Sequence, residues 1–260
     1  MIGLANCGSG QAMSAMSEET DNPGATASAS FTRQGLHLQV SCAPRQAEYV
    51  AGAPIEVEVA VSNRSSHPAF YLIGDAGPRV AYLEFSATLL PLGQKLRDPF
   101  PGNPVEPEGM TSSIQVAPGQ SHVRSVLLNQ YVALEDARTM IAPGRRARLK
   151  VAWRCYMVVT RSFPELLPDA VPLSGSFHTG LTRDDAALRQ IVEALAARLT
   201  SDWNLKSSDP VGRRQSLAAL TSLRIPETVP YLKALLEHPD SEVRYGAEQA
   251  LHELQHDAKQ

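Results

Sequence analysis

Short runs in which every second residue is apolar fill the chain from about Phe31 to Thr182. Clear examples are Leu36–Val40, Ile55–Val61 and Leu83–Leu89. Successive side chains of a β-strand point to opposite faces, so a period of two predicts strands that are buried on one face. Clusters of Gly, Pro and Asn separate these runs, and no helical pattern interrupts them. We therefore predict an antiparallel β-sandwich for this part of the chain.

The hydrophobic period changes after Thr182. Apolar residues then recur at intervals of three and four, as in Leu188, Val192, Leu195 and Leu199. This spacing places them on one face of an α-helix. Three more stretches with the same spacing follow, and Asp or Pro residues stand at their starts, where they can cap or begin a helix. The sequence thus predicts a second, all-α part.

The helical part contains an internal repeat. A shift of 31 residues aligns five pairs of matching residues, which are Asp209 with Asp240, Arg213 with Arg244, Ala219 with Ala250, Leu220 with Leu251 and Leu223 with Leu254. A period near this length with paired helices is typical of a solenoid. The stretch from Pro226 to Leu254 resembles the bacterial HEAT repeats of the phycobilisome-lyase type. This resemblance implies a fold and a role in binding proteins, and it implies no enzymatic activity.

The strand-rich part has a looser resemblance. Glu48–Val59 with Asn63, the turn Ala117–Gly119, and Pro143-Gly144 before a long strand resemble immunoglobulin-like domains of bacterial envelope proteins. The same features are similar to the intracellular proteinase inhibitor family. Because these features are mostly turn chemistry and strand pattern, they predict a fold better than an activity.

The two patterns together predict a two-domain chain, all-β and then all-α. Residues 1–30 form a disordered tether, residues 31–183 form an immunoglobulin-like β-sandwich, and residues 184–260 form a short solenoid of HEAT-like helical hairpins. The tether is rich in Gly, Ala, Ser and Thr and holds almost nothing that can pack. Such a composition does not bury enough apolar surface to offset the entropy cost of ordering it.

A cysteine near the start of the chain has two interpretations. The segment Leu4-Ala5-Asn6-Cys7 and the Gly/Ser-rich residues after it resemble the end of a bacterial lipoprotein signal. In that case Cys7 is lipidated, and the protein is a periplasmic or envelope lipoprotein. In the other case Cys7 is an incidental residue of a disordered, cytoplasmic N-terminus.

Two further cysteines lie in predicted strands. Cys42 continues the alternating set that contains Val40, and Cys155 continues the set that contains Trp153. Both thiols are therefore expected to point into the same core. A disulfide between them is geometrically possible and would suit an oxidising compartment. Two buried, reduced thiols are the equal alternative.

Composition and charge exclude several functional classes. The 260 residues are 43% hydrophobic and 20% charged, with a formal net charge of −3. Neither half concentrates positive charge, so the phosphate backbone of a nucleic acid has no matching surface. No apolar run approaches the roughly 18 residues that a membrane-spanning helix needs.

One motif has the spacing of a metalloenzyme site. His252-Glu253-Leu254-Gln255-His256 satisfies H-E-x-x-H, in which two His on one helical face bind zinc and the Glu activates water. Only four residues follow it, and no downstream residue supplies the usual third ligand. An exposed helical end is therefore the preferred interpretation.

These observations favour a non-enzymatic protein-binding or scaffold protein of the bacterial envelope, with a protein as partner. We expect no catalytic residue, metal or cofactor. The first alternative is a proteinase inhibitor that inserts a long sandwich loop, such as Asp98–Gly109 or Ser162–Pro172, into a protease cleft. The second alternative is a zinc-dependent hydrolase that uses His252, Glu253 and His256.

Overall fold

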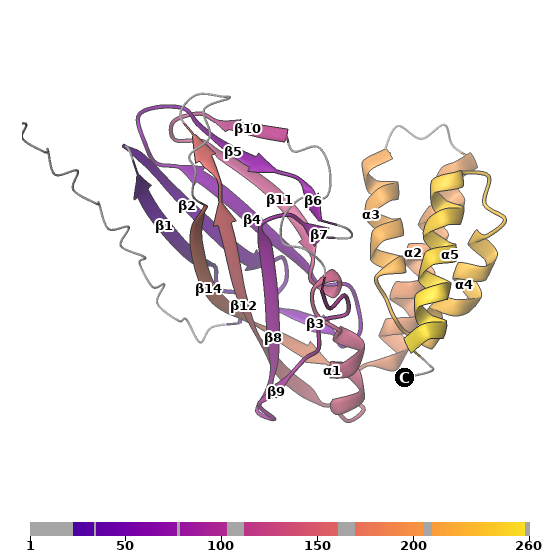
Figure 1. Ribbon diagram of the computed structural model, residues 1–260. Coiled ribbons are helices and arrows are strands. Elements are labelled where there is room, and N and C mark those ends of the chain that lie inside the picture. The colour runs from indigo at the N-terminus through magenta and orange to yellow at the C-terminus, as the bar shows by residue number, and fades with distance from the viewer. Residues whose placement is uncertain are drawn as a thin grey trace, which may run out of the picture.

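The computed structural model describes residues 23–33, 35–76, 79–102, 112–160, 170–204 and 210–257. Within these ranges the strands lie before residue 183 and the long helices after it, which confirms the all-β then all-α order (Figure 1). Cys7 lies outside the described residues, so its lipidation stays a prediction. Among the described helices, none has the length and apolar character that a membrane crossing requires.

The first sheet of the β-domain has four antiparallel strands in the order β1-β2-β4-β11. The strands are β1 (Ala27–Arg33), β2 (Leu36–Pro44), β4 (Glu56–Asn63) and β11 (Ser121–Leu127). The first strand begins at Ala27, so the last four residues of the predicted tether, 27–30, belong to the sheet. Because β11 is the last strand in the order, it forms one edge of this sheet.

The second sheet has the strand order β3-β14-β12-β8-β9. The strands are β3 (Glu48–Val50), β8 (Leu83–Leu90), β9 (Gln94–Lys95), β12 (Arg146–Met157) and β14 (Val171–Thr182). One pair departs from the antiparallel prediction, because β3 runs parallel to β14. The chain reaches β3 directly from the first sheet, and so a crossover between the sheets replaces a hairpin at this edge.

Shorter elements complete the β-domain. A three-stranded sheet has the order β10-β5-β13, and a two-stranded hairpin joins β6 to β7. The bounds are β5 (Ala69–Ile73), β6 (Asp75–Ala76), β7 (Arg79–Val80), β10 (Ser112–Val116), β13 (Val159–Thr160), the 3-10 helix η1 (Leu128–Gln130) and the helix α1 (Leu134–Met140).

The two main sheets pack face to face over one core. Every second residue is buried in β2, β4 and β8, and in β12 from Leu149 onward, as the period of two predicted. Leu38 and Val57 from the first sheet share this core with Leu89, Val151 and Trp153 from the second. Full burial of each such side chain contributes about 1.5–3 kcal/mol, so the alternating pattern is also the main source of stability.

Helix α1 lies in a region for which no helix was predicted. Leu134, Ala137 and Ile141 recur at helical spacing and are buried. Glu135 and Asp136 stand in the first turn, where the helix dipole favours acidic residues. With only seven residues, the helix contains two turns of periodic signal, and this is too little to stand out among the strands around it.

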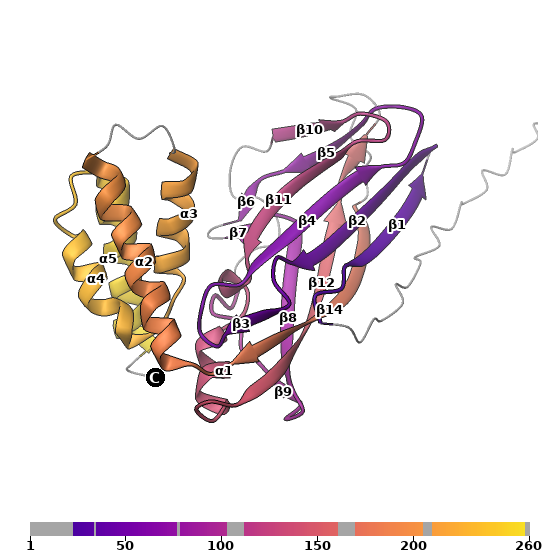
Figure 2. The ribbon, with the colours of Figure 1, turned by 180° about the vertical axis from the view of Figure 1, so that it is seen from behind.

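The helical part consists of α2 (Asp185–Asn204), α3 (Pro210–Thr221), the 3-10 helix η2 (Pro226–Thr228), α4 (Val229–Leu235) and α5 (Ser241–Asp257). These helices enclose a second core of their own, which includes Leu188, Leu199, Leu220 and Leu232. Asp240 caps α5, since its Oδ1 accepts a hydrogen bond of 2.8 Å from the amide of Glu242. The helices stand beside the β-domain, and α2 leaves it next to α1 (Figures 1 and 2).

Cys42 and Cys155 are both buried in the core of the β-domain, and both are free thiols in the structure. Burial raises the pKa of Cys42 well above its ordinary value and raises that of Cys155 to about 12. Both groups are therefore protonated at neutral pH, and the disulfide between them stays a prediction.

Trp153 fills space that only a glycine leaves open. Its partner across the β12–β14 ladder is Gly175. A Cβ atom added to Gly175 would lie 2.8 Å from Cζ2 and 2.9 Å from Nε1 of the Trp153 indole. These distances are shorter than any real Cβ contact, so the indole or the strand would have to move.

We therefore predict that Gly175→Ala lowers the free energy of unfolding by about 1–3 kcal/mol through overpacking. Ser174→Ala, an exposed change on the same strand, is the control and is expected to stay within about 0.5 kcal/mol. Chemical denaturation of both variants measures the effect. Equal midpoints for the two variants would show that the core accommodates the added methyl group.

Candidate interdomain binding groove

One arginine joins the β-domain to the helical domain. Arg138 of α1 donates two hydrogen bonds to the carboxylate of Glu227, at 2.6 and 3.1 Å, and one of 2.9 Å to Asp185. Its side chain is 16% exposed. The bond to Glu227 is the main cause that raises the pKa of Arg138, and the bonds from Arg138 lower the pKa of Asp185 and Glu227. We call these three residues the Arg138 cluster.

A second arginine ties α5 to the loop after β9. Arg224 donates a hydrogen bond of 2.8 Å to Glu253 and one of 3.1 Å to the carbonyl oxygen of Pro99. Its guanidinium also lies 4.3 Å from the ring centroid of Phe100, a cation–π contact. The Arg224 side chain is 6% exposed. The base of this loop is therefore held by the helical domain.

Apolar contacts lie between these polar links. Ala53 of the β-domain is buried in the core of the helical domain, in the same cluster as Leu188. The neighbouring Gly52 has a φ of +87°, and a Cβ atom there would lie 3.2 Å from Cδ of Arg138. Glycine therefore allows both the turn and the close approach of Arg138. Together with the two arginines, these contacts dock the helices on one end of the β-domain.

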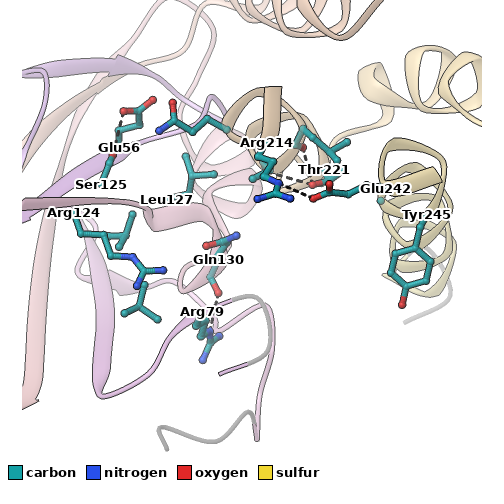
Figure 3. A pocket seen from close by; sticks show the side chains of 16 residues that line it. Glu56, Arg79, Arg124, Ser125, Leu127, Gln130, Arg214, Thr221, Glu242 and Tyr245 are labelled. Atoms are coloured by element: carbon teal, nitrogen blue, oxygen red, sulfur yellow. Dashed lines mark hydrogen bonds and ion pairs between the residues drawn. The ribbon is translucent and has the colours of Figure 1, made fainter. Parts of the chain in front are cut away.

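Beyond this docked end, the two domains enclose an open groove with a volume of about 720 Å³. Strand β11 forms one wall through Arg124, Ser125, Val126 and Leu127, and Arg79, Val80 and Gln130 lie beside it. Helices α3 and α5 form the other wall, through residues that include Arg214, Leu217, Ala218, Thr221, Glu242 and Tyr245. Figure 3 shows Arg124, Ser125 and Leu127 of β11 on one side, and Arg214, Thr221, Glu242 and Tyr245 of the helices on the other. We call this space the interdomain groove.

The interdomain groove continues past Glu56 into a second hollow of about 590 Å³. Tyr49 and Arg146 of the β-domain line that hollow together with Ile191 of α2 and Ala219 of α3. Glu56 accepts a hydrogen bond of 2.6 Å from Arg45 and one of 3.2 Å from Ser125. Helix α3 therefore stands over a depression that runs along the side of the β-domain.

The lining of the interdomain groove includes charged side chains and one exposed aromatic ring. Arg214 and Glu242 form an exposed ion pair at 3.2 Å, and Arg79 pairs with Asp98. Tyr245 is 65% exposed, so its ring is accessible to a bound molecule. Among the described residues, no group of three or more His, Cys, Asp or Glu side chains is placed to hold a metal ion.

The residues of the H-E-x-x-H motif make contacts that differ from those expected at a zinc site. Glu253 accepts the hydrogen bond from Arg224 described above, so its carboxylate is committed to the domain contact. His252 is exposed on α5. The side chain of His256 lies outside the described residues, and the zinc alternative is not supported by the position of Glu253.

The two loops considered for protease inhibition are described only in part. Asp98 to Gly102 belong to the first loop, and its first residues contact Arg79 and Arg224. Residues 103–109 of the first loop and 162–169 of the second lie outside the described residues. The inhibitor alternative stays a prediction.

Comparisons with known proteins identify one part of the chain. A family model of HEAT repeats matches residues 192–260. The match confirms the HEAT repeats predicted for the helical part, and it leaves the β-domain unassigned. A search of curated proteins gave no match.

Solved structures give only weak similarities. A protein from Archaeoglobus fulgidus has a TM-score of 0.30 and 14% identity, over 56% of this chain and 95% of its own length. A β-glucosidase from Listeria innocua has 0.22 and 12%, over 55% of this chain and 16% of the enzyme. A β-glucosidase from Erythrobacter marinus has 0.20 and 11%, over 52% and 14%. Scores this low support no conclusion about fold or activity.

The sequence did not predict the interdomain groove or the contacts that hold its two walls in place. Arg138 and Glu227 are 89 positions apart, and no spacing rule connects them. The edge position of β11 depends on the order of strands in the sheet. One signal was present in the sequence, namely the acidic residues at the starts of α2 and η2, which mark helix ends that an arginine can approach.

We predict that Arg138→Gln lowers the free energy of unfolding by about 2 kcal/mol, because two half-buried carboxylates lose their partner. Arg45→Gln breaks the exposed pair with Glu56 and is expected to cost less than about 0.5 kcal/mol. The lowered pKa values of Asp185 and Glu227 mean that the stabilisation is present above the ordinary carboxyl range and is lost as the pH falls below about 4. Denaturation curves at pH 7 and pH 3 measure both effects, and a constant difference between wild type and Arg138→Gln would contradict the assignment.

Glu135 of α1 is expected to give the opposite pH dependence. Burial raises its pKa to about 7, although Arg97 lies 3.0 Å from its carboxylate. The folded state then binds a proton more tightly than the unfolded chain, so stability falls as the pH rises from about 4.5 to 7. The free energy of unfolding of Glu135→Gln should therefore fall by roughly 1–3 kcal/mol less than that of the wild type over this pH range. Parallel pH curves for the variant and the wild type would show that Glu135 is ionised throughout.

Proposed function

We propose that this protein is a non-enzymatic binding or scaffold protein, and that its protein partner occupies the interdomain groove. The observation that carries the proposal is that both domains line this space, with β11 on one side and the HEAT helices α3 and α5 on the other. HEAT repeats present extended surfaces on which other proteins bind. The β-domain adds a second wall, which compensates for the small surface of so short a helical stack.

The nature of the groove surface supports a protein partner. Tyr and Arg are enriched at the energetically dominant positions of protein interfaces, and Tyr245, Arg214 and Arg124 contribute to this lining. Leu217 and Val80 add apolar surface to the same lining. The docked end of the two domains is held by the Arg138 cluster, so the walls are arranged before a partner arrives.

The finer assignments form part of the same proposal. We propose that the β-domain is immunoglobulin-like, that the helices are HEAT repeats of the phycobilisome-lyase type, and that the protein works in the bacterial envelope. Support for the β-domain comes from its two facing sheets and from the turn residues described above. A lipid on Cys7 would anchor the protein to a membrane.

Site-specific photo-cross-linking tests the position of the partner. A photoreactive phenylalanine analogue at position 245 should give discrete cross-linked products in the native cell, because Tyr245 stands in the groove wall. The same analogue at position 92 is the control, since Leu92 is 61% exposed in the segment between β8 and β9 and lies outside the groove lining. Mass spectrometry identifies the products.

The expected result is a partner that cross-links at position 245 and not at position 92, and that binds Tyr245→Ala at least about tenfold more weakly, as for an interface hot spot. The proposal is wrong if position 245 gives no product, or if both positions give the same ones.

A further inference from the structure

The hydrogen bonds that flank the β4–β11 ladder show which main-chain groups of β11 are used. The amide of Leu128 donates to the carbonyl oxygen of Ile55 at 2.9 Å, and the amide of Asn63 donates to the carbonyl oxygen of Gln120 at 2.9 Å. Both pairs continue the antiparallel register of the two strands. Because bonded and non-bonded pairs alternate in such a ladder, the even-numbered residues of β11 face β4.

The odd-numbered residues of β11 therefore direct their N–H and C=O groups away from β4. These residues are Ser121, Val123, Ser125 and Leu127. The hydrogen bonds on the opposite side of β4 are consistent with this assignment. The amide of Arg45, in the segment after β2, donates to the carbonyl oxygen of Glu56, which is an even-numbered residue of β4. In β4 the main-chain groups of the even-numbered residues thus hydrogen-bond to β2, and those of the odd-numbered residues hydrogen-bond to β11.

The outward main-chain groups of β11 have no partner among the described residues. No described hydrogen bond uses the amide of Val123, Ser125 or Leu127, and Val123 is 51% exposed. Proteins normally protect an open edge with charged residues, Pro, a bulge, a very short strand or a covering helix or loop. The seven residues of β11 contain no Lys or Pro, and Arg124 is their one charged residue. Figure 2 shows β11 at the side of its sheet that is nearest to the helices.

The interdomain groove lies along the second half of this edge. Arg124 to Leu127 of β11 form one wall, and α3 and α5 stand opposite (Figure 3). The volume of about 720 Å³ is in the range that holds one ligand of modest size. A whole sheet from a second molecule would have to continue through the space that α3 occupies. A single extended segment fits this arrangement better.

We propose that the open edge of β11 binds an extended peptide segment of the partner as an added β-strand. This inference rests on the proposed function and names the chemistry of the partner. Main-chain groups of Ser125 and Leu127 in the groove, and of the exposed Val123 next to it on the same edge, bind the peptide backbone. Its side chains alternate, so one set reaches Val80 and Val126, while the other set faces the helices.

Charge in the lining favours a peptide that carries a carboxylate. Three arginines and two glutamates line the groove, and these are Arg79, Arg124, Arg214, Glu56 and Glu242. The arginines that already form ion pairs keep donors for a second acceptor, since a guanidinium has five N–H groups. The arginines of the lining outnumber its glutamates, so a positively charged peptide side chain would be repelled. We therefore expect an extended segment with acidic residues among its alternating side chains.

A random peptide library displayed on phage provides the probe. Peptides selected on the full chain are synthesised, and their binding is measured by fluorescence anisotropy. Val123→Pro removes one outward N–H and leaves the ladder to β4 intact, because proline is tolerated on the open side of an edge strand. Val123→Ala changes the side chain and keeps the N–H.

The expected result is that Val123→Pro weakens binding by about tenfold or more, while Val123→Ala changes it by less than about threefold. Circular dichroism and thermal unfolding confirm that Val123→Pro is folded. If it is not folded, an N-methyl scan of the peptide decides the question with wild-type protein alone. Methylation of every second peptide amide should abolish binding, and methylation of the intervening amides should not, because only alternate amides face β11.

Each outcome bears on one idea. Peptides that lose affinity for Tyr245→Ala but show no alternation in the N-methyl scan would overturn strand addition and leave the proposed function intact. A library that yields no binder also overturns strand addition. A dimer that is seen by light scattering and lost in Val123→Pro would make a second copy of the chain the occupant, against our proposal. The proposed function itself is tested separately, by the cross-linking experiment at position 245.

Discussion

The relative position of the two domains depends on the bonds that Arg138 makes with Asp185 and Glu227. The arginine belongs to α1 of the β-domain, and its partners stand at the starts of α2 and η2. A planar guanidinium that binds one carboxylate with two parallel hydrogen bonds fixes direction as well as distance. The arginine is mostly shielded from solvent, so the contact is screened less than a surface ion pair. The opening of the interdomain groove is set at this docked end.

The consequence for the proposed function is preorganisation. A partner that enters a space with fixed walls does not have to order the two domains first, and the free energy of its contacts appears in the affinity. Arg224 contributes in the same way, since it binds Glu253 of α5, the Pro99 carbonyl and the ring of Phe100. The sheet edge of β11 then faces a wall instead of bulk solvent. An edge placed in this way can accept one strand while the helices obstruct the growth of a larger sheet.

The H-E-x-x-H motif shows how a local pattern differs from a site. His252, Glu253 and His256 have the spacing of a zinc-binding helix, and this spacing follows from helix geometry alone. The role of Glu253 is set by Arg224, which is 29 positions away and donates to it at 2.8 Å. The same limit applies to Cys42 and Cys155. Alternation placed both thiols in one core, but their separation and bonding depend on how the two sheets pack.

The sequence by itself determined the order of an all-β and an all-α part, the HEAT repeats, most strands and the buried faces, because hydrophobic period is a local property that burial enforces at each element. Only the tertiary structure decided the edge position of β11, the parallel pairing of β3 with β14, and the contact of Arg138 with Glu227. These features join residues that are far apart in the chain, and they result from the packing of whole layers. Helix α1 is an intermediate case. Its hydrophobic pattern is local, but it spans too few residues to distinguish a short helix from a loop.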